Sequence, residues 1–183
     1  AALLLAGAGA IVTGVDASEP MLAIARERAA RAGAAVTFLQ RDAHDLKFAD
    51  HDFEIVVCLR VLMHTPRWRR CVAELCRVSN RLVIIDYPSA RSAALAQSWV
   101  RRITYRFGAR NEPYRVFSER ELSDAIQAAG FHVVSVHRQF VLPIALHKAI
   151  GSPRFTRTAE ALLRRLRLTA LFGSPVTLLA ERA

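Results

Sequence analysis

The stretch IVTGVDASEPMLAIARERAARAG, residues 11–33, decides the fold. Its first six residues are rich in β-branched side chains and predict a short buried strand over 11–16. Ser18 can cap a following helix, Pro20 suits the first turn of that helix, and Gly33 marks its end. A strand that ends on an aspartate and turns at once into a helix indicates a binding corner, because ligands of open α/β sheets lie beyond the carboxyl ends of the strands.

Further apolar runs continue this alternation of strand and helix. Strands are predicted over 36–40, 54–59 and 81–87, and a helix opens at Thr65-Pro66. The alternation predicts an α/β fold with a Rossmann-like, doubly wound and mostly parallel sheet.

The later part of the sequence follows a different pattern. Ser118 and Glu121 have the spacing of a capping box, which predicts the start of a helix. Strands over 131–140 and 175–182 are predicted to form an antiparallel pair. Residues 141–172, between these strands, are predicted to form a helical cap or insert.

Size and composition are those of an ordinary globular protein, and we expect a single domain over residues 1–183. The chain is 52% hydrophobic and 23% charged, and no apolar run reaches the length of a membrane span. Cys58, Cys71 and Cys76 lack metal-ligand spacing, so we expect reduced thiols, no metal site and a cytoplasmic setting.

The formal net charge is +10, mostly from arginine. Nucleic acid, an anionic membrane surface or an anionic substrate would each suit such a charge. The basic residues are scattered instead of striped, which favours a fourth interpretation, a solvated arginine-rich surface.

Acidic residues follow two strands that we expect to be neighbours. Asp16 has two acceptor oxygens, which suits the vicinal hydroxyls of a ribose; the alternative is a helix-capping aspartate, a role that Ser18 already fills. Asp42 could accept from the amino group of an adenine, and the Ala43 N–H could donate to a ring nitrogen. A plain surface turn is the alternative for Asp42.

The pieces GVDAS, EPML, FLQRDAHDL, DFEIVVCLRVLMH and AELCRVS occur in that order. Together they resemble the class I S-adenosylmethionine-dependent methyltransferases, most of all the type 11 group that includes ubiquinone and menaquinone methyltransferases. The resemblance covers residues 1 to about 87 and returns at AAGF and the last two strands. It implies S-adenosyl-L-methionine as the cofactor and methyl transfer as the reaction.

The resemblance also implies roles for individual residues. Asp16 would bind the ribose, and Asp42 with Ala43 would contact the adenine. The remaining implied cofactor-binding residues flank the adenosine or pass under the methionine part: Ala17, Ser18, Met21, Cys58, Leu59 and Arg60.

One departure concerns the glycine-rich loop that the family places between its first strand and first helix. Gly7 and Gly9 do not follow a strand, and AALLLAGAGA corresponds to the end of that first helix. We therefore expect an N-terminally truncated fragment, in which two strands lose their shared neighbour.

Methyl transfer from a sulfonium is an in-line displacement that requires mainly alignment and a dry pocket. His64 is the candidate general base if the acceptor must lose a proton, with a structural role as the alternative. Tyr87 and Arg91 could line the acceptor pocket or anchor a loop.

The acceptor is predicted from absent motifs and from the insert. Base-modifying relatives carry Asn/Asp-Pro-Pro-aromatic where this chain has Cys-Leu-Arg-Val, and the imperfect copy over 111–114 is misplaced. The Pro-Cys pair of RNA cytosine-5 enzymes is also missing, because Val57 precedes Cys58. Nucleic acid is therefore disfavoured as the substrate.

The segment 141–172 mixes apolar residues with Arg154, Arg157, Arg164, Arg165 and Arg167. It could cap an apolar acceptor, rest on an anionic membrane, or pack on the sheet with its arginines in water. We expect a small, apolar acceptor such as a quinone precursor or another lipid-like metabolite.

Two rival functions remain. A short-chain dehydrogenase would need Tyr-x-x-x-Lys where this chain has Tyr87-x-x-x-Arg91, and arginine does not readily replace that lysine. A degenerate Rossmann domain could instead serve as a non-catalytic binding module.

Overall fold

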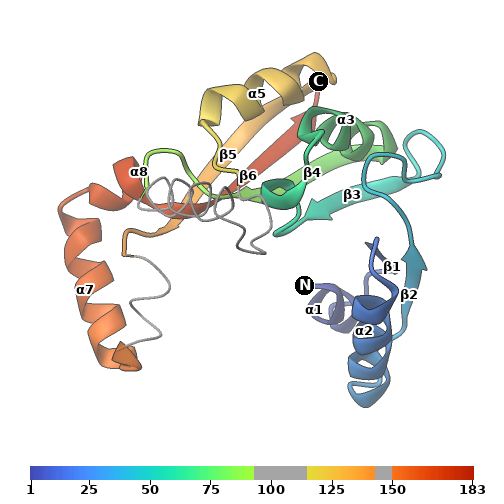
Figure 1. The fold of residues 1–183 in the computed structure, drawn as a ribbon, viewed down its shortest axis with the longest axis horizontal. Helices are drawn as coiled ribbons and strands as arrows, with labels where there is room; N and C mark the ends of the chain where they lie inside the picture. The colour runs from blue at the N-terminus through green and yellow to red at the C-terminus, as the bar shows by residue number, and fades with distance from the viewer. Residues whose placement is uncertain (93–114, 143–149) are drawn as a thin grey trace, which may run out of the picture. The chain divides into compact units, whose positions relative to one another are not determined.

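The computed structural model describes residues 1–92, 115–142 and 150–183, which fall into two compact units, Ala1–Phe48 and Ala49–Ala183 (Figure 1). The sequence over 111–114 lies outside the described residues. Within the described residues, no helix is both long and apolar enough to cross a membrane.

The first unit is a strand-helix-strand motif preceded by a short helix. Its elements are α1 (Ala2–Gly7), β1 (Val12–Asp16), α2 (Glu19–Arg31) and β2 (Val36–Gln40). The two strands are parallel, and their register runs without a shift from Val12 opposite Val36 to Asp16 opposite Gln40. These elements confirm the strands, the helix and the helical N-terminus predicted from the sequence.

A small core holds the first unit together. The buried apolar side chains among residues 1–48 are Leu22, Ala29 and Leu46. Gly14 lies against the Phe38 ring so closely that an added Cβ would come within 2.7 Å of it. Glycine at this position therefore lets the Phe38 ring approach strand β1 closely.

The second unit carries a mixed sheet. Its elements are β3 (Phe53–Cys58), the 3₁₀ helix η1 (Leu62–His64), α3 (Trp68–Val78), β4 (Ser79–Tyr87), α5 (Glu119–Ala128), β5 (Phe131–Phe140), α7 (Pro153–Arg165), α8 (Leu168–Phe172) and β6 (Ser174–Arg182). The strand order is β3-β4-β6-β5; β3 and β4 are parallel, and β6 is antiparallel to both β4 and β5. The predicted antiparallel C-terminal pair is confirmed, whereas η1 was not predicted.

The core of this unit lies between the sheet and the helices α3 and α5 (Figure 1). Trp68, Val72 and Leu75 of α3 are buried. Phe117 packs edge-on against Trp68, with ring centroids 5.2 Å apart. Along β6, every second residue from Val176 to Ala180 is buried, as expected for a strand with one face on the core.

Each unit has a strand edge with no strand partner. Within the described residues, β1 pairs with β2 alone and β3 pairs with β4 alone.

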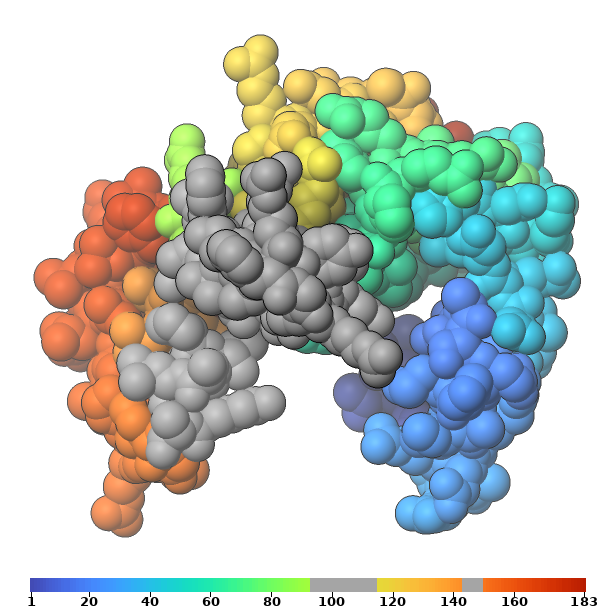
Figure 2. All heavy atoms as spheres, in the orientation of Figure 1, coloured from blue at the N-terminus to red at the C-terminus, as the bar shows by residue number. Residues whose placement is uncertain are grey.

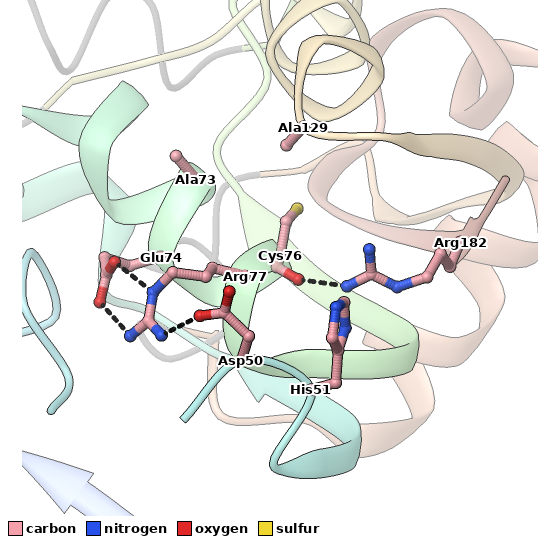
Figure 3. A pocket seen from close by; sticks show the side chains of 8 residues that line it. All are labelled: Asp50, His51, Ala73, Glu74, Cys76, Arg77, Ala129 and Arg182. Carbon is pink, nitrogen blue, oxygen red and sulfur yellow. Dashed lines mark hydrogen bonds and ion pairs between the residues drawn. The ribbon is translucent and has the colours of Figure 1, made fainter. Parts of the chain in front are cut away.

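The amino-terminal ends of β3 and β4 border a hollow of about 430 Å³ (Figure 3). Arg182 donates from Nη2 to the Cys76 carbonyl at 2.9 Å and to the Ser79 carbonyl, so it caps the end of α3. Arg77 donates to Glu74 and Asp50, and these bonds raise its pKa. Arg182 thus joins the last strand to the end of α3, and Arg77 joins α3 to the loop before β3.

Helix α5 provides a stability test. The Ser118 hydroxyl accepts from the Glu121 N–H at 3.2 Å, and Glu121 Oε2 accepts from the Ser118 N–H at 3.0 Å. Ser118→Ala should therefore lower the free energy of unfolding by about 1 kcal/mol. Ser18→Ala is the matched comparison, because the Ser18 side chain makes no capping bond to α2. Urea unfolding of both variants checks this, and an equal loss in both would contradict it.

Candidate functional site

Asp16 ends strand β1, and its side chain is exposed at the carboxyl edge of the small sheet. Its Oδ1 accepts a hydrogen bond from the Ser18 N–H at 2.8 Å, whereas the Ser18 side chain makes no capping bond. Ser18 is thus the N-cap residue of α2, as the sequence predicts, although its side chain makes no capping bond. Oδ2 of Asp16 has no partner among the described residues, so it can accept from a ligand.

Asp42 and Ala43 follow β2 at the same edge. The Arg41 N–H donates to the Asp16 carbonyl at 3.1 Å, which continues the pairing one residue beyond β2. Gln40 Nε2 donates to the Ala17 carbonyl at 2.9 Å. The structure thus brings the two predicted acidic residues to the ends of neighbouring parallel strands.

His44 orients Asp42, a contact that the sequence analysis missed. Asp42 Oδ1 accepts from the His44 N–H at 2.9 Å and lies 2.6 Å from His44 Nδ1. The signal in the sequence was the Asp-x-His spacing in a polar turn. Met21, 54% exposed in the first turn of α2, presents an apolar side chain to solvent, where it could flank a bound base.

In the second unit, Cys58 ends strand β3 and is buried. A hydrogen bond with Cys71, together with burial, raises the pKa of the Cys58 thiol well above its usual value. The thiol therefore stays protonated and is a poor nucleophile. Leu59, the next residue, is 41% exposed.

Arg60 adopts a left-handed backbone conformation with φ of 61°. Its N–H donates to Oδ1 of Asp86, the penultimate residue of β4, which is buried. A non-glycine residue in this region costs about 1–3 kcal/mol, so the bond from Arg60 to Asp86 helps to hold a strained loop. Burial raises the pKa of Asp86, and the bond from Arg60 opposes that rise.

Asp86 was not assigned a role from the sequence. The available signal was an acidic residue within the otherwise apolar strand end VIIDY. An ionised carboxylate with little exposed surface is costly unless it is hydrogen-bonded, so its presence at a strand end marks a candidate functional position.

His64 ends η1 and is exposed, while its neighbours Leu62 and Met63 are buried. Its backbone N–H donates to the Val61 carbonyl at 3.0 Å. The two buried neighbours fix the turn and leave the imidazole at the surface. A role as general base stays a prediction.

Tyr87 ends β4 and is fully buried, with its ring centroid 6.3 Å from that of Phe117. Burial raises the pKa of Tyr87 to about 12. Arg91 is exposed four residues later, and its N–H donates to the Ser89 hydroxyl at 3.2 Å. Contact of either residue with an acceptor stays a prediction.

The predicted residues thus form two groups, one in each unit, and both lie at the carboxyl ends of parallel strands. Acidic side chains at two such ends suit a ligand with hydroxyl and amino donors. Across residues 1–92, 115–142 and 150–183, no cluster of three or more His, Cys, Asp or Glu side chains could hold a metal ion.

Known proteins match both the sequence and the fold. Residues 1–82 match the family described as methyltransferase domain. A demethylmenaquinone methyltransferase of Clavibacter sepedonicus is 33% identical over 165 residues, which is 80% of this chain and 66% of that protein. The demethylmenaquinone methyltransferase of Thermus thermophilus is 39% identical over 83 residues, which is 44% of this chain and 38% of that protein. The chain thus spans less than two thirds of either relative.

A solved structure shares the fold over the whole chain. The magnesium protoporphyrin IX methyltransferase of Synechocystis PCC 6803, solved with bound SAH, superposes with a TM-score of 0.68 at 21% identity and covers 100% of this chain and 68% of that one. The order of strands, the acidic strand ends and these matches agree with one another. Residues 1–82 therefore carry a methyltransferase domain, and the chain is similar to S-adenosylmethionine-dependent methyltransferases in sequence and in fold.

Proposed function

We propose that this chain binds S-adenosylmethionine and transfers its methyl group to a small, apolar, lipid-like acceptor. The observation that carries the proposal is the Asp16 carboxylate, which is held by the Ser18 N–H through one oxygen and is open at the other. Both compact units would belong to one methyltransferase domain, since the predicted cofactor contacts are divided between them.

The adenosine would be held by the first unit. Oδ2 of Asp16 would accept from a ribose hydroxyl, while Asp42 and the Ala43 N–H would contact the adenine. Because the Ser18 N–H already fixes the Asp16 carboxylate, little side-chain freedom is lost when a ligand binds. The exposed Met21 would cover the base with an apolar side chain.

The methionine part would lie over the loop from Cys58 to Arg60. The left-handed turn at Arg60 aims the Arg60 N–H at Asp86 and leaves Leu59 on the outside of the loop. Asp86 would therefore act as a positioning residue, because it fixes the backbone that contacts the cofactor.

When bound, S-adenosylmethionine supplies a methyl carbon that is activated by a positively charged sulfur. The residues of this chain would align the acceptor with that carbon and exclude water. His64 would remove a proton only if the acceptor has to lose one.

An apolar, lipid-like acceptor is supported by the surface of α7 and α8. One stripe along α7 and the residue that follows it carries three apolar side chains, each at least 40% exposed. They are Phe155, Leu162 and Leu166. The relatives named above are demethylmenaquinone methyltransferases, which favours a quinone precursor among apolar acceptors.

The same segment would contact an anionic membrane. Its arginines Arg154, Arg157, Arg164 and Arg165 are exposed, and α7 (orange) lies at the surface in Figure 2. Glu160, the acidic residue of α7, is buried and accepts from the N–H groups of Val141 and Leu142 at 3.0 Å. The exposed side of α7 therefore combines apolar and basic side chains, as interfacial helices do.

Replacement of Asp16 tests the cofactor assignment. Asp16→Asn keeps the shape of the side chain and an oxygen for the Ser18 N–H, but it removes the charge that strengthens bonds to the ribose. Affinity for S-adenosylmethionine should fall by about 10–100-fold in the full-length protein, measured by calorimetry. Glu27→Gln, an exposed carboxylate of α2, is the control and should bind as the parent does. Unchanged affinity in Asp16→Asn would reject the assignment.

The pH dependence of stability tests Asp86. Burial raises the pKa of Asp86 above 3.8, so the folded state favours the protonated carboxyl. The stability contributed by the protonated form is present at low pH and is lost as the pH rises through the folded-state pKa. Asp86→Asn should therefore be as stable as the parent, or more stable, at pH 7, and should lose this advantage near pH 3. Chemical denaturation at both pH values measures this.

Asp86→Val is the companion variant, since it keeps the branched shape and removes the acceptor for the Arg60 N–H. We expect about a tenfold loss of S-adenosylmethionine affinity, because the left-handed turn is released. Equal cofactor affinity in the Asn and Val variants would show that the Arg60 loop does not depend on Asp86.

Vesicle flotation tests the membrane contact. The full-length protein should float with phosphatidylglycerol vesicles and not with phosphatidylcholine vesicles. Each of Arg157→Gln and Arg164→Gln should weaken binding by roughly fivefold, since a basic residue near the surface contributes about 1 kcal/mol. Arg28→Gln, an exposed change on α2, should leave binding unchanged. Equal binding to both vesicle types would contradict the proposal.

A further inference from the structure

A second hollow, of about 350 Å³, lies in the second unit beyond the end of β4. It is formed by the loop after β4, the first turns of α5 and the end of β5, and is lined by Ser89, Arg91, Ser118, Glu119, Arg120, Ser123 and Arg138. Three of these residues are arginines and one is acidic. The lining is therefore net positive, unlike that of the hollow at the opposite ends of the strands.

The three arginines differ in how far they are neutralised. Arg138 is paired with Glu119, and its side chain is only 16% exposed. Arg120 lies 3.9 Å from Asp124, with a side chain that is 92% exposed. No ion pair or side-chain hydrogen bond of Arg91 is found among the described residues. Since exposed pairs are weak, Arg91 and Arg120 remain able to bind an anion.

Tyr87, the last residue of β4, lies on the sheet face that carries Arg138, one of the residues lining the hollow. Tyr87 pairs with Val176 across the sheet, and Val176 pairs with Arg138, so the three side chains share one face. The hydroxyl is buried and has no hydrogen-bond partner among the described residues.

The start of α5 adds backbone donors. The helix has 10 residues and begins at Glu119, and its capping box engages the N–H groups of Ser118 and Glu121. The first N–H groups of a helix have no acceptor within it, and they attract anions. Arginine side chains and the start of a helix thus meet at one hollow, and a buried hydroxyl without a partner among the described residues lies on the same sheet face as Arg138.

We propose that this hollow binds a carboxylate or phosphate group, held by Arg91 and Arg120 with the Tyr87 hydroxyl as a further donor. The assignment of that group to the methyl acceptor rests on the proposed function. The acceptor would then be amphiphilic, with an anionic group at Arg91 and an apolar body beyond it.

Calorimetric titration of the full-length protein tests the site. The probes are inorganic phosphate, benzoate and a soluble short-chain phosphatidic acid. We expect saturable binding that weakens by about tenfold in Arg91→Gln and is partly restored in Arg91→Lys. Arg28→Gln, an exposed arginine of α2 without an ion pair among the described residues, should bind as the parent does. Preference for phosphatidic acid would identify a lipid headgroup, and preference for benzoate an aromatic carboxylate.

Tyr87→Phe separates a binding role from a packing role. Removing a buried hydroxyl that has no partner should raise the melting temperature by about 2–4 °C. Removing the donor should lower phosphate affinity by about threefold. A side chain that only packs would change stability without changing anion affinity.

Several results would contradict the proposal of an anion-binding site. These are the absence of saturable binding for all probes, equal weakening in Arg91→Gln and Arg28→Gln, and unchanged affinity in Tyr87→Phe. Titration of the same samples with S-adenosylmethionine keeps the two proposals apart. If the cofactor does not bind but phosphate does, the proposed function fails and the anion site stands; the reverse result removes the site alone.

Discussion

The parallel pairing of β1 with β2 is the constraint on which the proposed cofactor site depends. The register is unbroken to Asp16 opposite Gln40, and the Arg41 N–H extends it by donating to the Asp16 carbonyl. Because both strands end at the same level, Asp16 and Asp42 emerge together at one edge. Backbone and imidazole groups then orient the two carboxylates through one oxygen each. The site is thus organised before any ligand arrives, which lowers the entropic cost of binding.

Three features at or near the end of β4 destabilise the folded state. Asp86 is a carboxylate with little exposed surface, the bonded Arg60 is held in a left-handed conformation, and Tyr87 buries a hydroxyl without a partner among the described residues. Such costs concentrate at functional sites, where strain and unsatisfied groups are available to a ligand. These groups lie at or near the end of β4, and Arg91 follows that strand in the chain. We therefore expect the ligand at this end to carry an anionic group.

The elements with strong local signals could be predicted from the sequence. The strands over 36–40 and 131–140 match the prediction to the residue, and both bonds of the capping box at Ser118 are present. Local signals were insufficient at the start of α2: Ser18 is its N-cap residue, but its side chain makes no capping bond, and Asp16 instead accepts from the Ser18 N–H. Other features depend on distant partners, such as Asp86 on Arg60 and Tyr87 on Phe117, which no periodicity reveals. The three-residue η1 is too short to carry a period.

A crystal structure of the full-length protein with S-adenosylhomocysteine would show whether Asp16 binds the ribose. We predict that Oδ2 of Asp16 lies within hydrogen-bonding distance of a ribose hydroxyl, while Oδ1 keeps its bond to the Ser18 N–H. A ribose bound elsewhere, with Asp16 contacting only Ser18, would contradict it.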